Sequence, residues 1–342
     1  MKKSYTGKYN FELEDGVYSA ELVEAAENLV FPTQYRGKRV ASVWADEYGP
    51  ANRAIVKTVE IPLGIKDIYG PLFECFSSLE TVSISASVEY IGSDVFGACP
   101  AIREIKVDPD NEEYISVSGN LYDKDMKTLI KLASASVGEC FAIPSGVEKI
   151  EDRAIENCEN LVKLHIPASL KEMEYLSIDK CTALKEISVD CDNEEYCSLY
   201  GCLYSKDLKI LIKATPGSPC ESYNIPEGVE EIGSWAFDGC RNLTELSLPE
   251  GLVTIACNAF GSCSSLKKIS LPKSLETIEL YAFENCTSLE EIVIPRSVNE
   301  IDMHAFDGCD KLTVLCEANE PGEDWHALWN CTSRPVKWGY KG

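Results

Sequence analysis

The sequence is poor in positive charge and in histidine. Its 342 residues contain 32 Lys and Arg against 56 Asp and Glu, a formal charge of −24, and only three histidines, His165, His304 and His326. An acidic surface without a basic run repels phosphate, so nucleic acids and anionic membrane surfaces are excluded as general partners. No apolar run approaches the roughly 18 residues that a membrane-spanning helix needs, so we expect no membrane insertion.

An apolar leader is also missing. Residues 1–3, Met-Lys-Lys, are followed by Ser-Tyr-Thr-Gly and not by an apolar segment, so we expect no secretory signal in this chain. The default compartment is then reducing, and the 16 cysteines need not pair. With 45% hydrophobic and 26% charged residues, the composition is that of a folded protein.

Motifs for catalysis are absent as well. The sequence has no G-x-x-x-x-G-K-[ST], H-E-x-x-H or G-x-S-x-G pattern. His165 stands at an exposed strand position between Leu164 and Ile166, with no nucleophile beside it in the sequence. A Cys/His enzyme needs a positioned pair and an orienting group, so we expect no enzyme, no catalytic residues and no cofactor.

A repeat of 23 residues dominates the chain. Apolar-Pro pairs recur at this interval, at Leu248-Pro249, Leu271-Pro272 and Ile294-Pro295. Two longer intervals of 36 residues, 107–143 and 189–225, interrupt the period. Because segments 107–131 and 189–213 are identical at 17 of 25 positions, the chain contains a duplicated unit of 82 residues.

Each repeat reads L-x-x-I-x-I-P-x-x-V-x-x-I-x-x-x-A-F-x-x-C. In one copy, Ile292 and Ile294 alternate as in a short strand with one buried face, and Pro295 ends that strand. Ala305-Phe306-x-x-Cys309 has room for only a turn of helix. One such unit cannot close a core, but stacked copies can, so we predict a solenoid whose coils pair through parallel strands.

The two long intervals contain hairpin signals. In the first, residues 120–122 and 128–131 flank the polar turn Asp123-Lys124-Asp125, and the second repeats this arrangement around Ser205-Lys206-Asp207. We expect both hairpins to protrude from, or to extend, one side of the solenoid.

The ends of a solenoid need covers, because stacking leaves apolar surface there. Residues 9–20, with an Asp-Gly turn, predict a capping hairpin, and Trp325, Trp329 and Trp338 are suited to cover the last coil. We therefore expect a single repeat domain over residues 1–342: an N-terminal cap at 1–55, repeats over 56–315 with hairpin inserts near 108–142 and 190–224, and a Trp-rich cap at 316–342.

The combination of I-P, V-x-x-I and A-F-x-x-C resembles the BspA-type leucine-rich repeat family over roughly residues 9–340. Seven cysteines keep the register: Cys99, Cys158, Cys181, Cys240, Cys263, Cys286 and Cys309. The resemblance implies an α/β leucine-rich-repeat solenoid, horseshoe-like and right-handed, with short parallel strands, mostly β and turn with little helix. It also implies a bacterial protein without catalytic residues, whose relatives include adhesins that bind host or bacterial proteins.

The sequence leaves two alternatives for where the protein is located. The resemblance implies display on the cell surface or secretion, whereas the missing leader predicts a cytoplasmic chain.

The cysteines and the acidic runs offer alternatives to a purely structural interpretation. We interpret the register cysteines as a column of small buried residues. Four more cysteines lie in the second insert: Cys191, Cys197, Cys202 and Cys220. A local disulfide or a zinc site remains an alternative for them, although we expect no metal site. The runs 108–113 and 190–195 superficially match calcium loops, but they lack the oxygen ligands and the glycine, so we favour turns that lead into the hairpins.

The solvent-facing strand positions are where a partner would bind. They form a stripe of mixed charge, for which a merely solvated sheet face is an equally good interpretation. Binding hot spots favour Tyr, Trp and Arg, and we expect Tyr122, Tyr200 and Tyr204 of the hairpins to be exposed. The candidate partner-binding residues are Arg103, Lys106, Lys163, His165, Lys185, Glu245, Lys267, Glu290, Tyr122 and Tyr204.

We therefore predict a monomer with a non-catalytic, adhesin-like function, which binds a protein ligand of unspecified identity along its sheet face or its hairpins. Two alternatives stay open: an intracellular structural or assembly scaffold, and a thiol-based redox or metal-binding protein. The net charge of −24 is better explained as a solubility device than as a binding signal.

Overall fold

The computed structural model describes residues 5–46, 48–218 and 221–341, and nearly all regular structure in them is strand. The helices among these residues are two single 3₁₀ turns, η1 (Arg53–Ile55) and η2 (Ser134–Ser136), which confirms the prediction of little helix. No helix in this part of the chain has the length and apolar character of a membrane span. The chain forms two compact units: Met1–Leu161 with Ser169–Cys181, and Val162–Ala168 with Thr182–Gly342.

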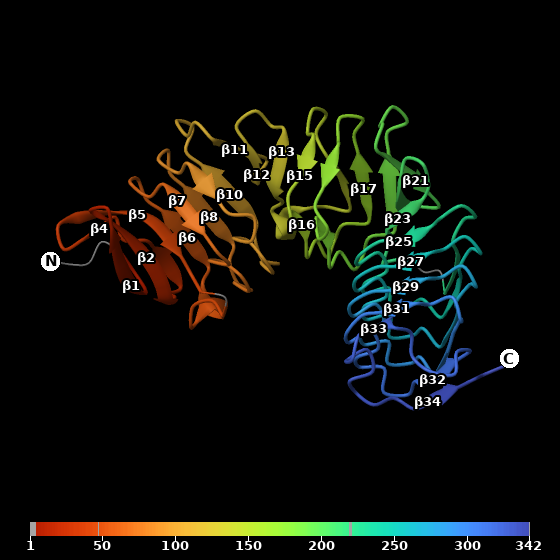
Figure 1. The fold of residues 1–342 in the computed structure, drawn as a ribbon. Coiled ribbons are helices and arrows are strands. Elements are labelled where there is room, and N and C mark those ends of the chain that lie inside the picture. The colour runs from red at the N-terminus through yellow and green to blue at the C-terminus, as the bar shows by residue number, and fades with distance from the viewer. Residues whose placement is uncertain (1–4, 47, 219–220, 342) are drawn as a thin grey trace. The chain divides into compact units, whose positions relative to one another are not determined.

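The first unit contains three long ladders, of which the third is built on the first insert, and one short one (Figure 1). One ladder has β1 (Lys8–Glu14), β2 (Val17–Glu24), β5 (Lys38–Trp44), β7 (Asp67–Tyr69) and β9 (Tyr90–Ile91), with β4 (Gln34–Tyr35) on β5. The second has β3 (Asn28–Val30), β6 (Thr58–Ile61), β8 (Thr81–Ile84) and β10 (Glu104–Val107). The short one pairs β16 (Ile155–Glu156) with β19 (Ile178–Asp179), and β14 (Cys140–Ala142) is a further strand of this unit.

The first insert adds its strands to a ladder of the first unit. β11 (Tyr114–Val117), β12 (Asn120–Asp123) and β13 (Thr128–Lys131) pair antiparallel, and β13 continues in parallel to β15 (Lys149–Ile150) and β18 (Glu172–Met173). The predicted hairpin is therefore confirmed, and it extends a ladder of the solenoid.

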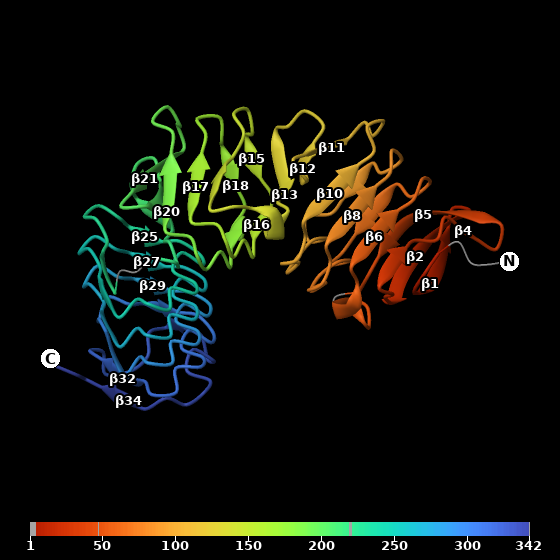
Figure 2. The same cartoon turned by 180° about the vertical axis from the view of Figure 1, so that it is seen from behind.

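The second unit repeats this plan (Figure 2). β17 (Lys163–Ile166) pairs with β20 (Glu186–Val189), and β24 (Ser222–Asn224) with β26 (Glu245–Ser247). The longest ladder runs through β21 (Tyr196–Leu199), β22 (Cys202–Ser205), β23 (Ile210–Lys213), β25 (Glu231–Ile232), β27 (Thr254–Ile255), β29 (Thr277–Ile278), β31 (Glu300–Ile301) and β33 (Asp324–Trp325). The last has β28 (Lys268–Ser270), β30 (Glu291–Ile294), β32 (Thr313–Cys316) and β34 (Val336–Trp338).

Parallel pairing aligns the repeats residue by residue, since Ile232, Ile255, Ile278 and Ile301 each face their equivalents one coil away. All four side chains are buried. Strand residues alternate between this core and solvent, as the two-residue period of a strand requires.

A stack of phenylalanines fills the turn side of the second unit. Phe237, Phe260, Phe283 and Phe306 lie nearly parallel, with successive ring centroids 5.3, 5.1 and 5.6 Å apart. Trp329 closes this stack edge-on, 6.1 Å from Phe306, as expected of a cap. At the other end of the chain, Asp15 and Gly16 both have positive φ, the conformation that a tight hairpin turn needs between β1 and β2.

The register cysteines are all buried, which confirms their interpretation as a packing column. Five of their thiols, all but those of Cys158 and Cys240, also donate hydrogen bonds to backbone carbonyls of the preceding coil. Examples are Cys309 to Phe283 at 3.0 Å and Cys286 to Phe260 at 3.2 Å. A small apolar side chain with a weak donor thus adds a hydrogen bond to buried carbonyls such as those of Phe283 and Phe260, which also accept a backbone N–H group.

Candidate functional site

A groove lies on the exposed face of β6, β8 and β10 in the first unit. Glu60, Ser83 and Lys106 stand opposite one another on these three adjacent strands. The short Ser83 between two long charged side chains leaves a depression of about 510 Å³. Pro62, Leu63, Ser85 and Asp108 extend its lining into the turns that follow the strands.

The chemistry of this groove is mixed. Leu63 is 71% exposed, an unusually open position for a leucine, and Glu60 and Lys106 place opposite charges on the two outer strands. Lys106 pairs with Glu104 on its own strand at 3.2 Å, and both side chains stay about half exposed. Such exposed ion pairs are weak and are easily exchanged for pairs with a partner. We call the residues Glu60, Leu63, Ser83, Lys106 and Asp108 the sheet groove.

A pocket of about 430 Å³ lies beside the second insert, in the second unit. Its lining includes Tyr200, Pro216, Tyr223 and Asn242. Tyr200 has φ +52° in the turn between β21 and β22 and is 75% exposed. Mostly apolar walls with a few amides and hydroxyls suit an apolar side chain of a ligand.

Most of the predicted partner-binding residues are solvent-accessible, but they do not converge on one site. Arg103 and Lys106 lie at β10, whereas Lys163 and His165 lie on β17. The rest lie on or directly before other strands of the second unit: Lys185, Glu245, Lys267 and Glu290. Some are already engaged, since Lys163 pairs with Glu186 at 2.6 Å and His165 Nδ1 lies 3.0 Å from the Ser188 hydroxyl.

The prediction that Tyr122 and Tyr204 are exposed is wrong. Tyr122 is 1% exposed and Tyr204 is 0% exposed. Both belong to the middle strand of their insert, β12 or β22, and their rings are buried there. The Tyr204 hydroxyl lies 2.6 Å from that of Tyr223, and burial raises the pKa of Tyr204 above its usual value. Of the three hairpin tyrosines, only Tyr200 offers an exposed ring.

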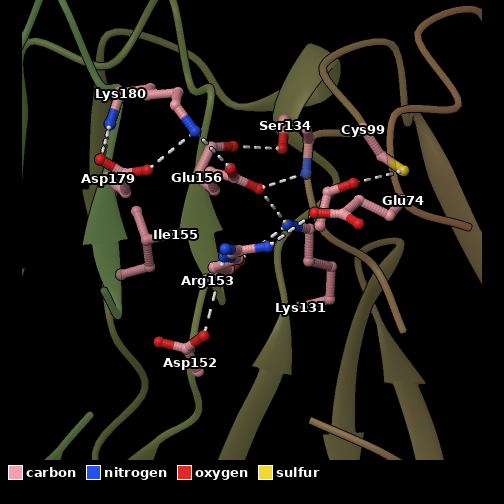
Figure 3. Close-up of polar contacts among 12 residues, drawn as sticks. Glu74, Cys99, Lys131, Ser134, Asp152, Arg153, Ile155, Glu156, Asp179 and Lys180 are labelled. Atoms are coloured by element: carbon pink, nitrogen blue, oxygen red, sulfur yellow. Dashed lines mark hydrogen bonds and ion pairs between the residues drawn. The ribbon is translucent and has the colours of Figure 1, made fainter. Parts of the chain in front are cut away.

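The first unit contains a cluster of buried charges that we did not predict from the sequence (Figure 3). Lys131 and Glu156 are 1% and 0% exposed in their side chains, and their charged atoms are 3.5 Å apart. Glu156 also accepts hydrogen bonds from Lys180 at 3.2 Å and from the Ala98 backbone N–H at 2.7 Å. The Lys131 ammonium donates to the Arg153 carbonyl at 2.7 Å.

The neighbours of this cluster are tied to it. Arg153 pairs with Glu74 at 3.2 Å, and Lys180 pairs with Asp179 at 3.1 Å. Burial alone would lower the pKa of Arg153, but the surrounding carboxylates, Glu156 foremost, raise it. A hydrogen-bonded cluster of this kind joins neighbouring coils, and its central pair, Lys131 and Glu156, is closed to solvent. The sequence contains one signal for this cluster: Lys131 recurs in the duplicated segment as Lys213, which is also buried.

The remaining cysteines of the second insert differ in their exposure to solvent. Cys191 is exposed, Cys197 is partly buried and Cys202 is buried, while Cys220 lies outside the described residues. Burial raises the pKa of register cysteines such as Cys99 and Cys240 to about 12, which keeps them protonated at neutral pH. Cys158 differs, because a hydrogen bond with the Cys181 thiol lowers its pKa, although both thiols are buried.

The acidic runs form turns, as we favoured. Asn111 is buried, and its amide nitrogen donates to the carbonyls of Ser85 and Val88 at 2.9 and 3.0 Å. Its amide oxygen accepts the backbone N–H groups of Glu113 and Tyr114. Asn193 accepts the equivalent pair of N–H groups in the second insert. The asparagine therefore ties the start of each hairpin to the backbone of the coil before it.

Solved structures of other proteins are similar to this chain. The pneumococcal vaccine antigen PcpA matches with a TM-score of 0.53 and 23% identity, over 93% of this chain and 82% of that one. A leucine-rich cell surface protein of Faecalibacterium prausnitzii A2-165 matches with a TM-score of 0.46 and 20% identity, over 98% and 97% of the two chains. The likeness to PcpA, at 23% identity, shows the fold, a leucine-rich-repeat solenoid. No curated protein sequence matches the chain significantly.

The family model for the BspA-type leucine-rich repeat region matches in six copies, over residues 51–122, 138–215 and 213–319. These ranges contain the I-P strands, the phenylalanine stack and most of the cysteine column described above. Because the matched repeats cover well over half of its residues, the chain belongs to the BspA-type leucine-rich repeat family.

Proposed function

We propose that this protein is a non-catalytic recognition scaffold of adhesin-like type, and that its sheet groove binds an extended segment of a partner protein. The observation that carries this proposal is the exposed Leu63 beside the opposed charges of Glu60 and Lys106. Protein interfaces combine an apolar anchor with a polar, charge-complementary surround. An extended segment fits, because the groove crosses three parallel strands spaced at roughly 4.8 Å, and this span of about 10 Å takes roughly three residues of extended chain.

The scaffold has the rigidity that such recognition needs. The residues beneath the groove, Ile61, Val82 and Ile84, are buried, so the strands that present Glu60, Ser83 and Lys106 are fixed by core packing. Binding to a preformed surface avoids the ordering cost that a flexible loop would add. The family membership supports the same role, since a repeat scaffold offers a long regular face for a partner.

The test compares capture by two variants of the full chain. The groove variant carries Leu63→Asp and Lys106→Glu. The control carries the same two exchanges outside the groove, Leu13→Asp and Lys38→Glu, at positions that are also exposed. Each protein is immobilised and exposed to an extracellular-matrix extract and to a bacterial lysate, and bound proteins are quantified by mass spectrometry.

We expect the wild type and the control to retain the same specific proteins, and the groove variant to lose them by about tenfold or more, as loss of interface hot spots does. If the groove variant retains the same set, the binding surface lies elsewhere. If the wild type retains nothing specific from either extract, recognition is the wrong function, and an assembly scaffold becomes the better interpretation.

A further inference from the structure

Three side chains of different metal-binding types meet at the C-terminal end of the second unit. His304 Nδ1 lies 2.8 Å from Asp307 Oδ2 and 3.1 Å from Cys331 Sγ. The Cys331 thiol lies 2.8 Å from the other oxygen of Asp307. One nitrogen, one sulfur and one carboxylate therefore converge on a common point, each within 4.8 Å of the others.

The stacking of coils brings these residues together. His304 and Asp307 belong to the turn after β31, and Cys331 belongs to the corresponding turn after β33. The two turns have the same hydrogen bond, from Asp307 N–H to the His304 carbonyl and from Cys331 N–H to the Leu328 carbonyl. Cys331 therefore occupies, one coil later, the position that Asp307 occupies in its own coil.

The same turn in earlier coils carries other residues. The position of His304 is Trp235, Asn258 and Tyr281 in the three preceding repeats, and that of Asp307 is Asp238, Gly261 and Glu284. All four residues at the His304 position have φ between +53° and +59°, so the turn geometry is common to them. Among the described residues of these four repeats, only the repeat of His304 and Asp307 places an imidazole and a carboxylate beside a thiol, that of Cys331 in the next coil.

We propose that His304, Asp307 and Cys331 form a binding site for a divalent transition-metal ion, with Zn²⁺ as the preferred ion. Thiolate, imidazole and carboxylate are the three ligand types of protein zinc, at about 2.3, 2.0 and 2.0–2.2 Å. A tetrahedral ion with those bond lengths separates its ligand atoms by about 3.3–3.6 Å. The three atoms now stand 2.8–3.1 Å apart, so shifts of about half an ångström would admit the ion.

The protons and charges balance at this site. On coordination the S–H proton of Cys331 leaves to solvent, the imidazole proton moves from Nδ1 to Nε2, and the freed Nδ1 lone pair binds the ion. The thiolate and the carboxylate then neutralise the two charges of Zn²⁺, and a water molecule takes the fourth position. The one arginine near this turn in the sequence, Arg334, is paired with Asp310 at 2.8 Å, so its charge is balanced.

The surroundings suit binding as well. His304 and Asp307 are each about a quarter exposed, so an ion can enter without opening the core. The Tyr281 ring stacks on the imidazole with centroids 5.2 Å apart and planes 16° from parallel. That contact restrains the ring and acts as an outer-shell support for a ligand. The ion would join the last repeat to the C-terminal cap, and this role is independent of the sheet groove.

The test uses the full, reduced, metal-free chain. Zn²⁺ affinity is measured by competition with a chromophoric chelator, and Co²⁺ serves as a spectroscopic probe of thiolate ligation. The ligand variants are Cys331→Ser, His304→Gln and Asp307→Asn. Cys191→Ser is the matched control, because Cys191 is an exposed thiol flanked by Asp190 and Asp192, the other group of metal-binding side chains in the described chain.

We expect one Zn²⁺ per chain and a thiolate-to-Co²⁺ charge-transfer band. Each ligand variant should bind about 100-fold more weakly or worse, and Tyr281→Leu about tenfold, in the range of outer-shell losses. The control should bind as the wild type does. Equal affinity in the wild type and Cys331→Ser, or no charge-transfer band, would overturn the proposal.

A second measurement on the wild type covers the case in which a ligand variant does not fold. Zn²⁺ should protect Cys331, but not Cys191 or Cys140, from alkylation by iodoacetamide, as read by peptide mass mapping. Cys140 and Cys191 are exposed free thiols and serve as internal references. Alkylation of Cys331 at the same rate with and without Zn²⁺ would show a free thiol and no metal site.

Discussion

At the scale of single residues, the phenylalanine stack should dominate the stability of the last coils. Phe306 is 1% exposed and lies between Phe283 and Trp329. Truncation to alanine leaves a cavity in contact with both rings, so Phe306→Ala should lower the free energy of unfolding by about 3–5 kcal/mol. Urea unfolding followed by circular dichroism measures this loss.

Tyr175→Ala is the control for that variant. Tyr175 is 82% exposed and should cost less than about 0.5 kcal/mol, as surface substitutions do. A loss below about 1 kcal/mol for Phe306→Ala would mean that the ring is not part of a close-packed core.

The buried pair of Lys131 and Glu156 gives a second prediction at this scale. Glu156→Gln removes one charge and leaves the 1% exposed Lys131 ammonium beside the backbone carbonyl of Arg153 (Figure 3). An uncompensated buried charge is costly, so we expect a loss of about 3–5 kcal/mol of stability. The same urea titration measures it.

The double variant Glu156→Gln/Lys131→Met tests the cause. Removal of the stranded ammonium should restore part of the loss, because the desolvation of that charge disappears with it. If the double variant is less stable than Glu156→Gln by as much as Lys131→Met alone destabilises the wild type, the two side chains are not energetically coupled.

At the scale of elements, lysine–glutamate ladders run across adjacent strands. Glu148 stands between Lys127, at 2.5 Å, and Lys171, at 2.7 Å, directly before β15, β13 and β18. Hydrogen bonds and charge from these two lysines lower the pKa of Glu148 to about 2. An exposed ladder of this kind aligns the coils, although solvent screens its energy.

This lowered pKa predicts a pH dependence. Glu148 has a lower pKa in the folded than in the unfolded chain, so its contribution is present above the unfolded pKa, about 4.5, and is lost as the pH falls towards about 2. Glu148→Gln should therefore make the loss of stability between these pH values shallower. Thermal unfolding at a series of pH values measures the slope.

Glu112→Gln is the matched control, at an exposed glutamate of the same unit. It should leave the acid slope as in the wild type. An unchanged slope in Glu148→Gln would mean that the ladder is not formed in solution, whatever its geometry.

At the scale of the whole molecule, the charge of −24 controls association. Exposed strands at the edge of a ladder invite pairing with other chains, and like charge keeps molecules apart. The charge vanishes near the isoelectric point of about 4.6. Solubility should therefore pass through a minimum there, and light scattering across pH 4 to 8 checks it. Uniform solubility over this range would show that charge is not the protecting device.

Both the duplication and the division into units belong to this scale. The sequence shows a duplicated segment, and each unit contains one copy of the hairpin insert, at β11–β13 and at β21–β23. In a solenoid each coil contacts only its neighbours, so each unit packs around its own run of coils. The single repeat domain with caps at 1–55 and 316–342 stays a prediction.

The sequence alone determined the solenoid, its register and its hairpins. These features depend on period, alternation and turn residues, which are local and are reinforced when every coil repeats them. Phe306 and Cys309 could be placed in the core because each has an equivalent one repeat away that makes the same contact. Because the pattern repeats, it predicts which side chains of neighbouring coils pack against each other.

Only the tertiary structure decided the features that depend on contacts between different positions of neighbouring coils. Lys131 is buried at the end of β13, and its partner Glu156, 25 residues later, makes that burial tolerable. Tyr122 and Tyr204 were predicted to be exposed hairpin rings, but they lie in the middle strand of each insert and are buried. His304 and Cys331 are 27 residues apart and off the 23-residue period, so no motif joined them. The period of the repeat determines which equivalent residues stack on one another. Which non-equivalent side chains come into contact depends on how each coil is displaced relative to the next, and only the tertiary structure shows this.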